Sequence, residues 1–190
     1  MSPAETTKQI AEPSPRVKAR IAGVFYLLTF VTGIFALVFV RGRLVANLIA
    51  TACYVVVTIL FYDLFKPVNS QLSLVAALFS LAGCLISVLS SFHLAPFDIN
   101  SLAFFGVYCL LIGYLILKSM FLPRILGALM MLGGLSWLTF LSPLLAKYLD
   151  PYNLAPGILG EGALTVWLLV AGVNAERWQE RAKSMGFGVG

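Results

Sequence analysis

Six long apolar stretches, each of the length that crosses a membrane, constrain this chain more than any other feature. Crossing ~30 Å of hydrocarbon takes about 20 residues, because a helix rises ~1.5 Å per residue. The chain is 60% hydrophobic and 11% charged over 190 residues, which is too apolar for a soluble domain of this size. In lipid, each stretch must be a helix that satisfies its own backbone hydrogen bonds. We predict spans at residues 21–40, 44–65, 71–92, 101–120, 125–146 and 157–175.

The connections between these stretches are short and leave no room for a separate soluble domain. The predicted fold is therefore all-α: a polytopic membrane protein whose residues 21–176 form a single bundle of six transmembrane helices. Residues 1–20 contain several prolines and few large apolar groups, a composition typical of a disordered tail. Residues 177–190 are predicted to form a C-terminal tail.

Lysine and arginine are distributed unevenly between the two sides of the predicted bundle. Of the 13 such residues, ten fall on the side of the two termini and three, Arg41, Arg43 and Lys147, on the other. The positive-inside rule then places both termini in the cytoplasm, in a multi-pass protein of the cell (cytoplasmic) membrane. This topology accounts for the net charge of +5, so we expect membrane lipids as partners and no nucleic acid.

No motif for catalysis, metal binding or a cofactor stands out in the sequence. Cys53, Cys84 and Cys109 are isolated within three different spans, and His93 is the single histidine. Neither a zinc-binding pattern nor a phosphate-binding glycine loop is present. We therefore predict no catalytic residue, no metal and no cofactor.

The second span carries polar residues at helical spacing. Asn47, Thr51, Tyr54 and Thr58 are separated by four, three and four residues, which places them on one face of a helix. Such a face can line a ligand pocket or a narrow aqueous path. It can equally join helices through hydrogen bonds worth about 1 kcal/mol or less each.

Ionisable residues within apolar spans are functional candidates, because burying them in hydrocarbon is costly. Glu161 is predicted to lie one turn inside the sixth span, with Arg41 and Arg43 just above it in the first outer loop. It either anchors an outward-facing polar site or caps its helix and pairs with an arginine. Asp63 and Arg124, near the opposite surface, are predicted to form a structural ion pair.

Three functions remain open from the residues alone. The first is binding or permeation of a small solute through an outward-facing polar site. The second is a non-catalytic accessory or assembly protein, which would use small-residue helix faces to contact a membrane protein partner or a second copy of itself. The third is a lipid-acting intramembrane enzyme, which would require Glu161, His93 and Asp98 to meet in one cleft.

Several segments together resemble one family of bacterial integral membrane proteins, which is designated domain of unknown function family 4386. They are residues 20–28 (RIAGVFYLL), 104–116 (FFGVYCLLIGYLI), 118–127 (KSMFLPRILG), 160–162 (GEG), 167–169 (WLL) and 172–174 (GVN). The resemblance implies a multi-helix bacterial membrane protein and no particular activity. It marks Arg124, Glu161 and Trp167 as positions of the family pattern without giving them a role.

Overall fold

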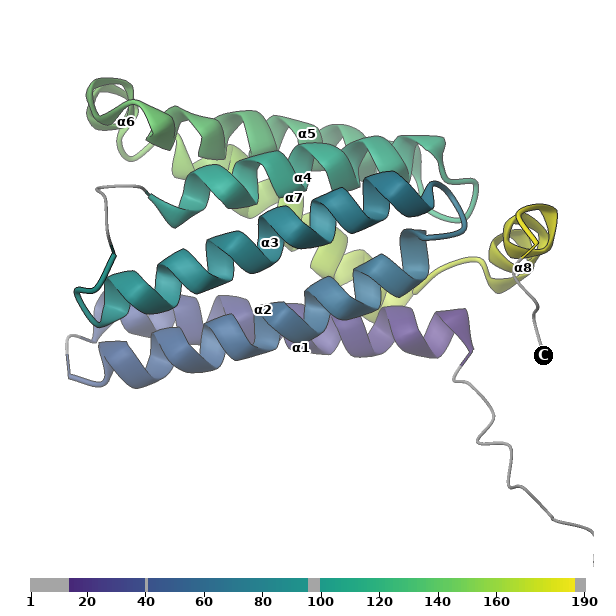
Figure 1. Ribbon diagram of the computed structural model, residues 1–190, viewed down its shortest axis with the longest axis horizontal. Coiled ribbons are helices and arrows are strands. Elements are labelled where there is room, and N and C mark those ends of the chain that lie inside the picture. The colour runs from purple at the N-terminus through teal and green to yellow at the C-terminus, as the bar shows by residue number, and fades with distance from the viewer. Residues whose placement is uncertain (1–13, 40, 96–99, 187–190) are drawn as a thin grey trace, which may run out of the picture.

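The computed structural model describes residues 14–39, 41–95 and 100–186, and the regular structure in these ranges is entirely helical. Six of the helices are long, and most of them run roughly along one axis (Figure 1). They are α1 (Pro15–Val38), α2 (Arg43–Phe65), α3 (Ser70–Ser91), α4 (Ser101–Lys118), α5 (Arg124–Leu138) and α7 (Leu154–Val170). Three short elements complete the fold: a 3-10 turn η1 (Thr139–Leu141), α6 (Pro143–Leu149) and α8 (Ala175–Ser184).

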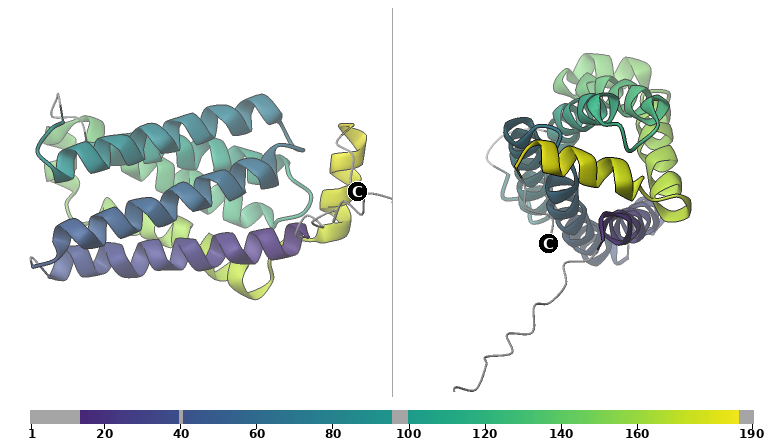
Figure 2. Two further views of the ribbon diagram at one scale, coloured as in Figure 1. Left: turned by 60° about the horizontal axis from the view of Figure 1, so that its bottom comes forward. Right: turned by 90° about the vertical axis from the view of Figure 1, so that its right-hand side faces the viewer.

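The six long helices form a closed ring. Each packs against two neighbours in the order α1, α2, α3, α4, α5 and α7, and α7 returns to α1. The view along the ring in Figure 2 shows this arrangement, with α8 lying across one end. That end, called the α8 end, also carries the start of α1 and the α2–α3 and α4–α5 turns. The opposite end, called the α6 end, carries α6 and the turn between α1 and α2.

The lengths and compositions of the helices agree with most of the predicted spans. Among the described residues, five helices are long and apolar enough to cross a membrane. A sixth span is obtained if α6 and α7, which meet at an angle of 81°, are taken together. The outward-facing side chains are apolar, with Ile59, Leu85 and Val166 each about 60% exposed.

The fifth predicted span is too long. Regular α-helix ends at Leu138, and residues 143–149 form the separate helix α6 instead of continuing α5. Ser142 adopts an extended conformation and its hydroxyl accepts a hydrogen bond from the Leu145 amide. A residue before proline disfavours the helical conformation, so Pro143 begins a new helix.

Both predicted tails contain helix. Residues 1–13 lie outside the described structure, but α1 already begins at Pro15, where the Ser14 side chain caps it. The C-terminal segment forms α8, whose Trp178 indole donates to the carbonyl of Leu64 at 2.8 Å. Arg177 likewise donates to the carbonyl of Met120 at 3.1 Å. These bonds hold α8 against the end of α2 and the turn that follows α4.

Helices α4 and α5 approach each other through paired glycines. A Cβ added at Gly113 would lie 2.7 Å from the Gly127 carbonyl oxygen, and the reverse addition gives the same distance. Gly106 and Gly134 form an equivalent pair about two helical turns away. Small residues permit this close backbone contact, which is typical of helix packing in membranes.

Candidate functional site

A cavity of about 360 Å³ lies inside the ring. Every ring helix contributes to it: the second half of α1, the first half of α2, the last turns of α3 and α5, and the first turns of α4 and α7. Because neighbouring helices alternate in direction, all these segments lie in the half of the bundle nearer the α6 end. The exposed lining is predominantly apolar, which makes the cavity less polar than the sequence analysis predicts.

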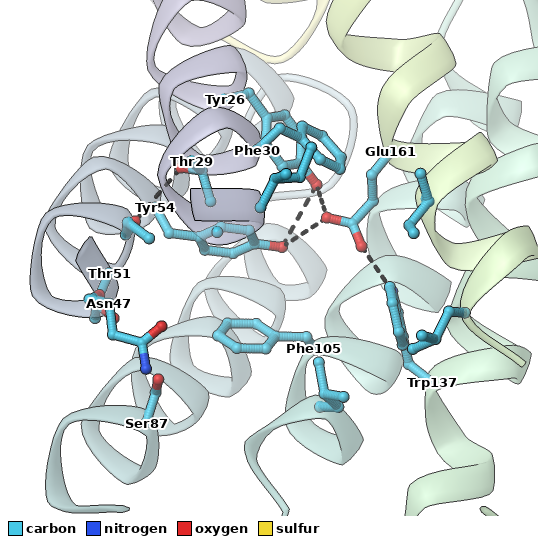
Figure 3. A pocket seen from close by; sticks show the side chains of 16 residues that line it. Tyr26, Thr29, Phe30, Asn47, Thr51, Tyr54, Ser87, Phe105, Trp137 and Glu161 are labelled. Atoms are coloured by element: carbon cyan, nitrogen blue, oxygen red, sulfur yellow. Dashed lines mark hydrogen bonds between the residues drawn. The ribbon is translucent and has the colours of Figure 1, made fainter. Parts of the chain in front are cut away.

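The carboxyl group of Glu161 forms the main polar feature of this cavity. The Tyr26 hydroxyl donates to Oε2 at 2.5 Å, and the Trp137 indole N–H donates to Oε1 at 2.6 Å. The Tyr54 hydroxyl lies 3.4 Å from the same Oε2. Figure 3 shows the three donors converging on the carboxyl group from α1, α2 and α5. Each of the four side chains is at most 8% exposed.

The hydrogen-bond geometry around Glu161 suits a carboxylate. An O–H···O distance of 2.5 Å lies in the range of charge-assisted bonds, and an indole N–H can only donate. Across the described residues, no lysine, arginine or histidine forms an ion pair with Glu161. The site therefore combines a buried acidic group and three neutral donors, and none of the described residues supplies a counter-charge.

The other end of the cavity carries two polar side chains, Asn47 and Ser87. Figure 3 shows them pointing toward each other from α2 and α3, on the far side of Phe105 from Trp137. Within the described part of the chain, neither side chain has a hydrogen-bond partner. Their polar atoms are therefore available to water or to a ligand.

The structure separates the sequence-predicted site residues into two groups. Asn47, Thr51, Tyr54 and Glu161 all line the cavity. Thr58 does not line it: the Thr58 hydroxyl lies 2.6 Å from the Ser80 hydroxyl and joins α2 to α3. Thr58 therefore joins two helices by a hydrogen bond, which was the alternative role for all four polar residues on this face of the second span.

The two arginines proposed for the site lie away from Glu161. Arg43 donates from Nε to the Ala36 carbonyl at 3.1 Å, which satisfies a free carbonyl near the end of α1. Arg41 is exposed in the α1–α2 turn, and neither arginine lines the cavity. Glu161 is the eighth residue of α7, so it does not cap the helix, and no arginine among the described residues forms an ion pair with it.

Asp63 is paired differently from the prediction. Its carboxylate forms salt bridges with Lys18 of α1 and with Lys66, one turn further along the chain. Among the described residues, no ion pair joins Asp63 to Arg124, which is exposed at the start of α5. The early start of α1 explains the difference, because it brings Lys18 beside Asp63.

Two principal site residues, Tyr26 and Trp137, were missed as site residues in the sequence analysis. A useful signal was present, because a buried tyrosine or tryptophan usually requires a hydrogen-bond acceptor. Of the acidic residues within the predicted spans, Asp63 lies near the opposite surface. Glu161 is therefore the acidic residue left as an acceptor for these donors. Pairing the buried aromatic donors with the buried acceptor would have brought both residues to the site.

Of the residues that a lipid-acting enzyme would bring together, His93 does not join Glu161 in the described structure. His93 is exposed and does not line the cavity, and Asp98 lies outside the described residues. None of the described histidine, cysteine and acidic side chains gather into a group that could hold a metal ion. What the cavity presents is an apolar volume with a carboxyl group at one end and two unpaired polar groups at the other.

These features define a protein whose described residues form only helices, which are compatible with a multi-pass membrane protein and line the cavity at Glu161. The chain belongs to the family described as "Domain of unknown function (DUF4386)", whose model matches residues 40–101 and 93–172. This match confirms the resemblance found in the sequence. An uncharacterized protein of Archaeoglobus fulgidus is 30% identical over 127 residues, which cover 62% of this chain and 76% of that relative. No solved structure matches the chain significantly.

The archaeal source of this relative bears on one expectation from the resemblance. Because this relative comes from an archaeon, a bacterial origin of the chain stays a prediction. The matched region contains Glu161, Trp137 and Tyr54 but begins after Tyr26. Most of the cavity therefore lies within the family region.

Proposed function

We propose that the protein is a multi-pass protein of the cytoplasmic membrane that binds a small amphipathic amine in its internal cavity. The apolar outer face of the ring supports insertion in lipid. Arg16, Lys66, Lys118, Arg124 and Arg181 all lie at or near the α8 end, which supports a cytoplasmic position for that end. The α6 end, and with it the cavity, then lies on the outer side.

The single observation that carries the binding proposal is the environment of Glu161. A carboxylate buried in an apolar bundle is strongly disfavoured unless it is hydrogen-bonded and paired with a positive charge. Tyr26 and Trp137 supply hydrogen bonds, but no described residue supplies the charge. An ammonium group of a ligand would supply it and add a donor to the free acceptor capacity of the carboxylate.

The shape of the cavity sets the rest of the ligand. A volume of about 360 Å³ lies at the lower end of the usual range of about 300–1,000 Å³ for ligand pockets. Phe30, Phe105 and Ile158 give it apolar walls suited to an alkyl or aromatic body. Asn47 and Ser87 can bond a second polar group at the far end.

Binding is better supported than permeation. Between the cavity and the α8 end, the interior of the ring is filled by large side chains that are at most 1% exposed, among them Phe61, Ile112, Met130 and Leu164. A solute that enters the cavity therefore meets a packed core. Transport would require these side chains to move apart.

The accessory-protein alternative receives less support from the packing. The small-residue face of α3 is used inside the ring, because Ser73, Ser80, Gly83 and Cys84 are buried. Ser80 bonds to Thr58, and a Cβ added at Gly83 would lie 3.1 Å from Phe104. This face is therefore not left over for a partner protein.

The proposal is tested with three eight-carbon probes that differ only in their end group: n-octylamine, n-octanol and octanoate. The protein is reconstituted in phosphatidylcholine nanodiscs, and binding is followed by tryptophan emission, because Trp137 contacts both Glu161 and the cavity. Empty nanodiscs correct for partition of each probe into lipid. We expect octylamine to bind tightest, by about tenfold or more over octanol, since a charge-assisted bond contributes about 1.5–3 kcal/mol.

Two variants assign that preference to the proposed carboxylate. Glu161→Gln is expected to remove the preference for octylamine while octanol binding changes little. Glu176→Gln, on the α8 helix, is the matched control and should behave as the wild type. Equal binding of octylamine and octanol by the wild-type protein would overturn the proposal. An octylamine preference that is retained in Glu161→Gln would also overturn it.

A further inference from the structure

Helices α1 and α7, which both line the cavity, diverge along their length. Near the α8 end they are in close contact: a Cβ added at Gly23 would lie 3.1 Å from Leu168 and from Leu169. Toward the α6 end, a Cβ added at Gly33 of α1 would meet nothing within 4 Å. Figure 1 shows the cause, since α7 runs obliquely behind the bundle from the α5 side to the α1 side.

Three residues at this divergence belong both to the cavity and to the surface of the ring. Gly33, Ile34 and Ile158 line the cavity. Ile34 is 59% exposed and Ile158 is 50% exposed, although both border an internal space. Between α5 and α7, by contrast, the helices are in contact beside the cavity, as Gly133 and Gly157 show. The wall between α1 and α7 therefore reaches the outer surface at these residues.

The chemistry of this opening is apolar. Gly33 has no side chain, and Ile34 and Ile158 are hydrocarbon. The outer face beside them, on α1 and α7, carries Val31, Phe35 and Leu159, each well exposed. A charged solute in water gains nothing by passing such residues, whereas a molecule dissolved in the bilayer passes them without leaving hydrocarbon.

We infer that ligands reach the Glu161 cavity sideways from the lipid bilayer, through an opening between α1 and α7 bordered by Gly33, Ile34 and Ile158. This inference rests on the proposed binding function and narrows its ligand class to molecules that partition into the membrane. The polar end of an amphiphile would enter first and bind Glu161. Its apolar body would pack against Phe30 and Phe105. Gly33 keeps the opening clear because it adds no side chain there.

Contact quenching of Trp137 fluorescence tests the route, since Trp137 lines the cavity and is only 8% exposed. Trp167 and Trp178 are replaced by phenylalanine, and the protein is reconstituted in phosphatidylcholine nanodiscs. Acrylamide probes access from water, and 1-bromooctane, a heavy-atom quencher that dissolves in lipid, probes access from the bilayer. If the double replacement does not fold, the difference in emission between the wild type and Trp137→Phe gives the same signal.

A pair of matched variants separates entry through the opening from quenching through the protein wall. Gly33→Leu places a branched side chain in the opening, where no atom obstructs it. Gly162→Leu makes the same change on α7, next to Glu161 in sequence, at a position that also faces open space but does not line the cavity. Octylamine binding is measured on each variant so that the route and the binding function are read separately.

We expect strong quenching by 1-bromooctane and weak quenching by acrylamide in the wild type. Most of the bromooctane quenching should be lost in Gly33→Leu and retained in Gly162→Leu. Efficient acrylamide quenching that Gly33→Leu leaves unchanged would overturn the side entrance in favour of a water-filled route, while the binding function stands. Absence of quenching by both agents, together with no octylamine binding, would overturn the binding function as well.

Discussion

The indole ring of Trp137 lies directly against the backbone of Gly157. A Cβ added at Gly157 would fall 2.2 Å from Cζ2 of that ring, far inside contact distance. The same indole donates its N–H to Glu161 at 2.6 Å. The absence of a side chain at Gly157 is therefore what allows Trp137, at the end of α5, to reach the carboxyl group one turn further along α7.

This relationship predicts that Gly157→Ala moves Trp137 and weakens its bond to Glu161. Overpacking of this kind costs about 1–3 kcal/mol of unfolding free energy. The measurement is denaturation in mixed micelles together with the wavelength of Trp137 emission. Gly162→Ala is the control, because its added methyl would meet nothing within 4 Å. Equal stability and emission for the two variants would show that the indole is not held as described.

The two tyrosines at Glu161 are predicted to differ in importance. Tyr26 lies 2.5 Å from Oε2 and Tyr54 lies 3.4 Å from it. Tyr26→Phe should lower the unfolding free energy by about 1.5–3 kcal/mol, as expected for a hydrogen bond to a charged group, and Tyr54→Phe by less. A double-mutant cycle of each with Glu161→Gln measures the coupling. A larger coupling for Tyr54 than for Tyr26 would contradict the geometry.

The ion pair at the α8 end gives a prediction that distinguishes two possible partners of Asp63. Coupling between Asp63→Asn and Lys18→Met should be about 1 kcal/mol or less, because the pair is partly exposed and therefore screened. Coupling between Asp63→Asn and Arg124→Met should be negligible, since Arg124 is exposed on α5. Unfolding in mixed micelles at low ionic strength measures both cycles. A significant coupling to Arg124 alone would restore the pair predicted from the sequence.

The paired glycines of α4 and α5 predict non-additive effects. Gly113→Ala and Gly127→Ala should each destabilise the bundle, because each new methyl would press on the backbone carbonyl of the opposite helix. Once one substitution has separated the helices, the second meets less resistance, so the double variant should cost less than the sum. Thermal unfolding of the single and double variants decides this. Gly33→Ala, which faces open space, serves as the neutral reference.

Much of the fold follows from hydrophobic length alone. Helices α2, α3 and α4 begin and end within about two residues of the predicted spans, because charged or turn-forming residues bound each apolar run. The break after α5 was missed because residues 144–146, Leu-Leu-Ala, continue the apolar composition of the helix before them. The Ser142-Pro143 pair carried the local signal for that break, and hydropathy does not register it.

The candidate site was predictable in part for a different reason. The spacing of Asn47, Thr51 and Tyr54 places them on one helix face, which the sequence shows directly. Glu161 also stands out in the sequence, because an acidic residue is unusual within a span. Which helices face each other inside the ring is a tertiary property that spacing within one helix does not contain. Tyr26 and Trp137 therefore entered the site only with the structure, as did the separation of Thr58 from it.

The most direct measurement of the central claim is a diffraction experiment on crystals of the protein grown with 8-bromooctylamine. Bromine gives an anomalous signal that locates one end of the probe independently of the protein coordinates. We predict a bromine peak inside the cavity, toward Asn47 and Ser87, with the amine at the Glu161 carboxylate and the peak absent in Glu161→Gln. Bromine peaks confined to the outer surface of the ring, with the cavity empty, would contradict it.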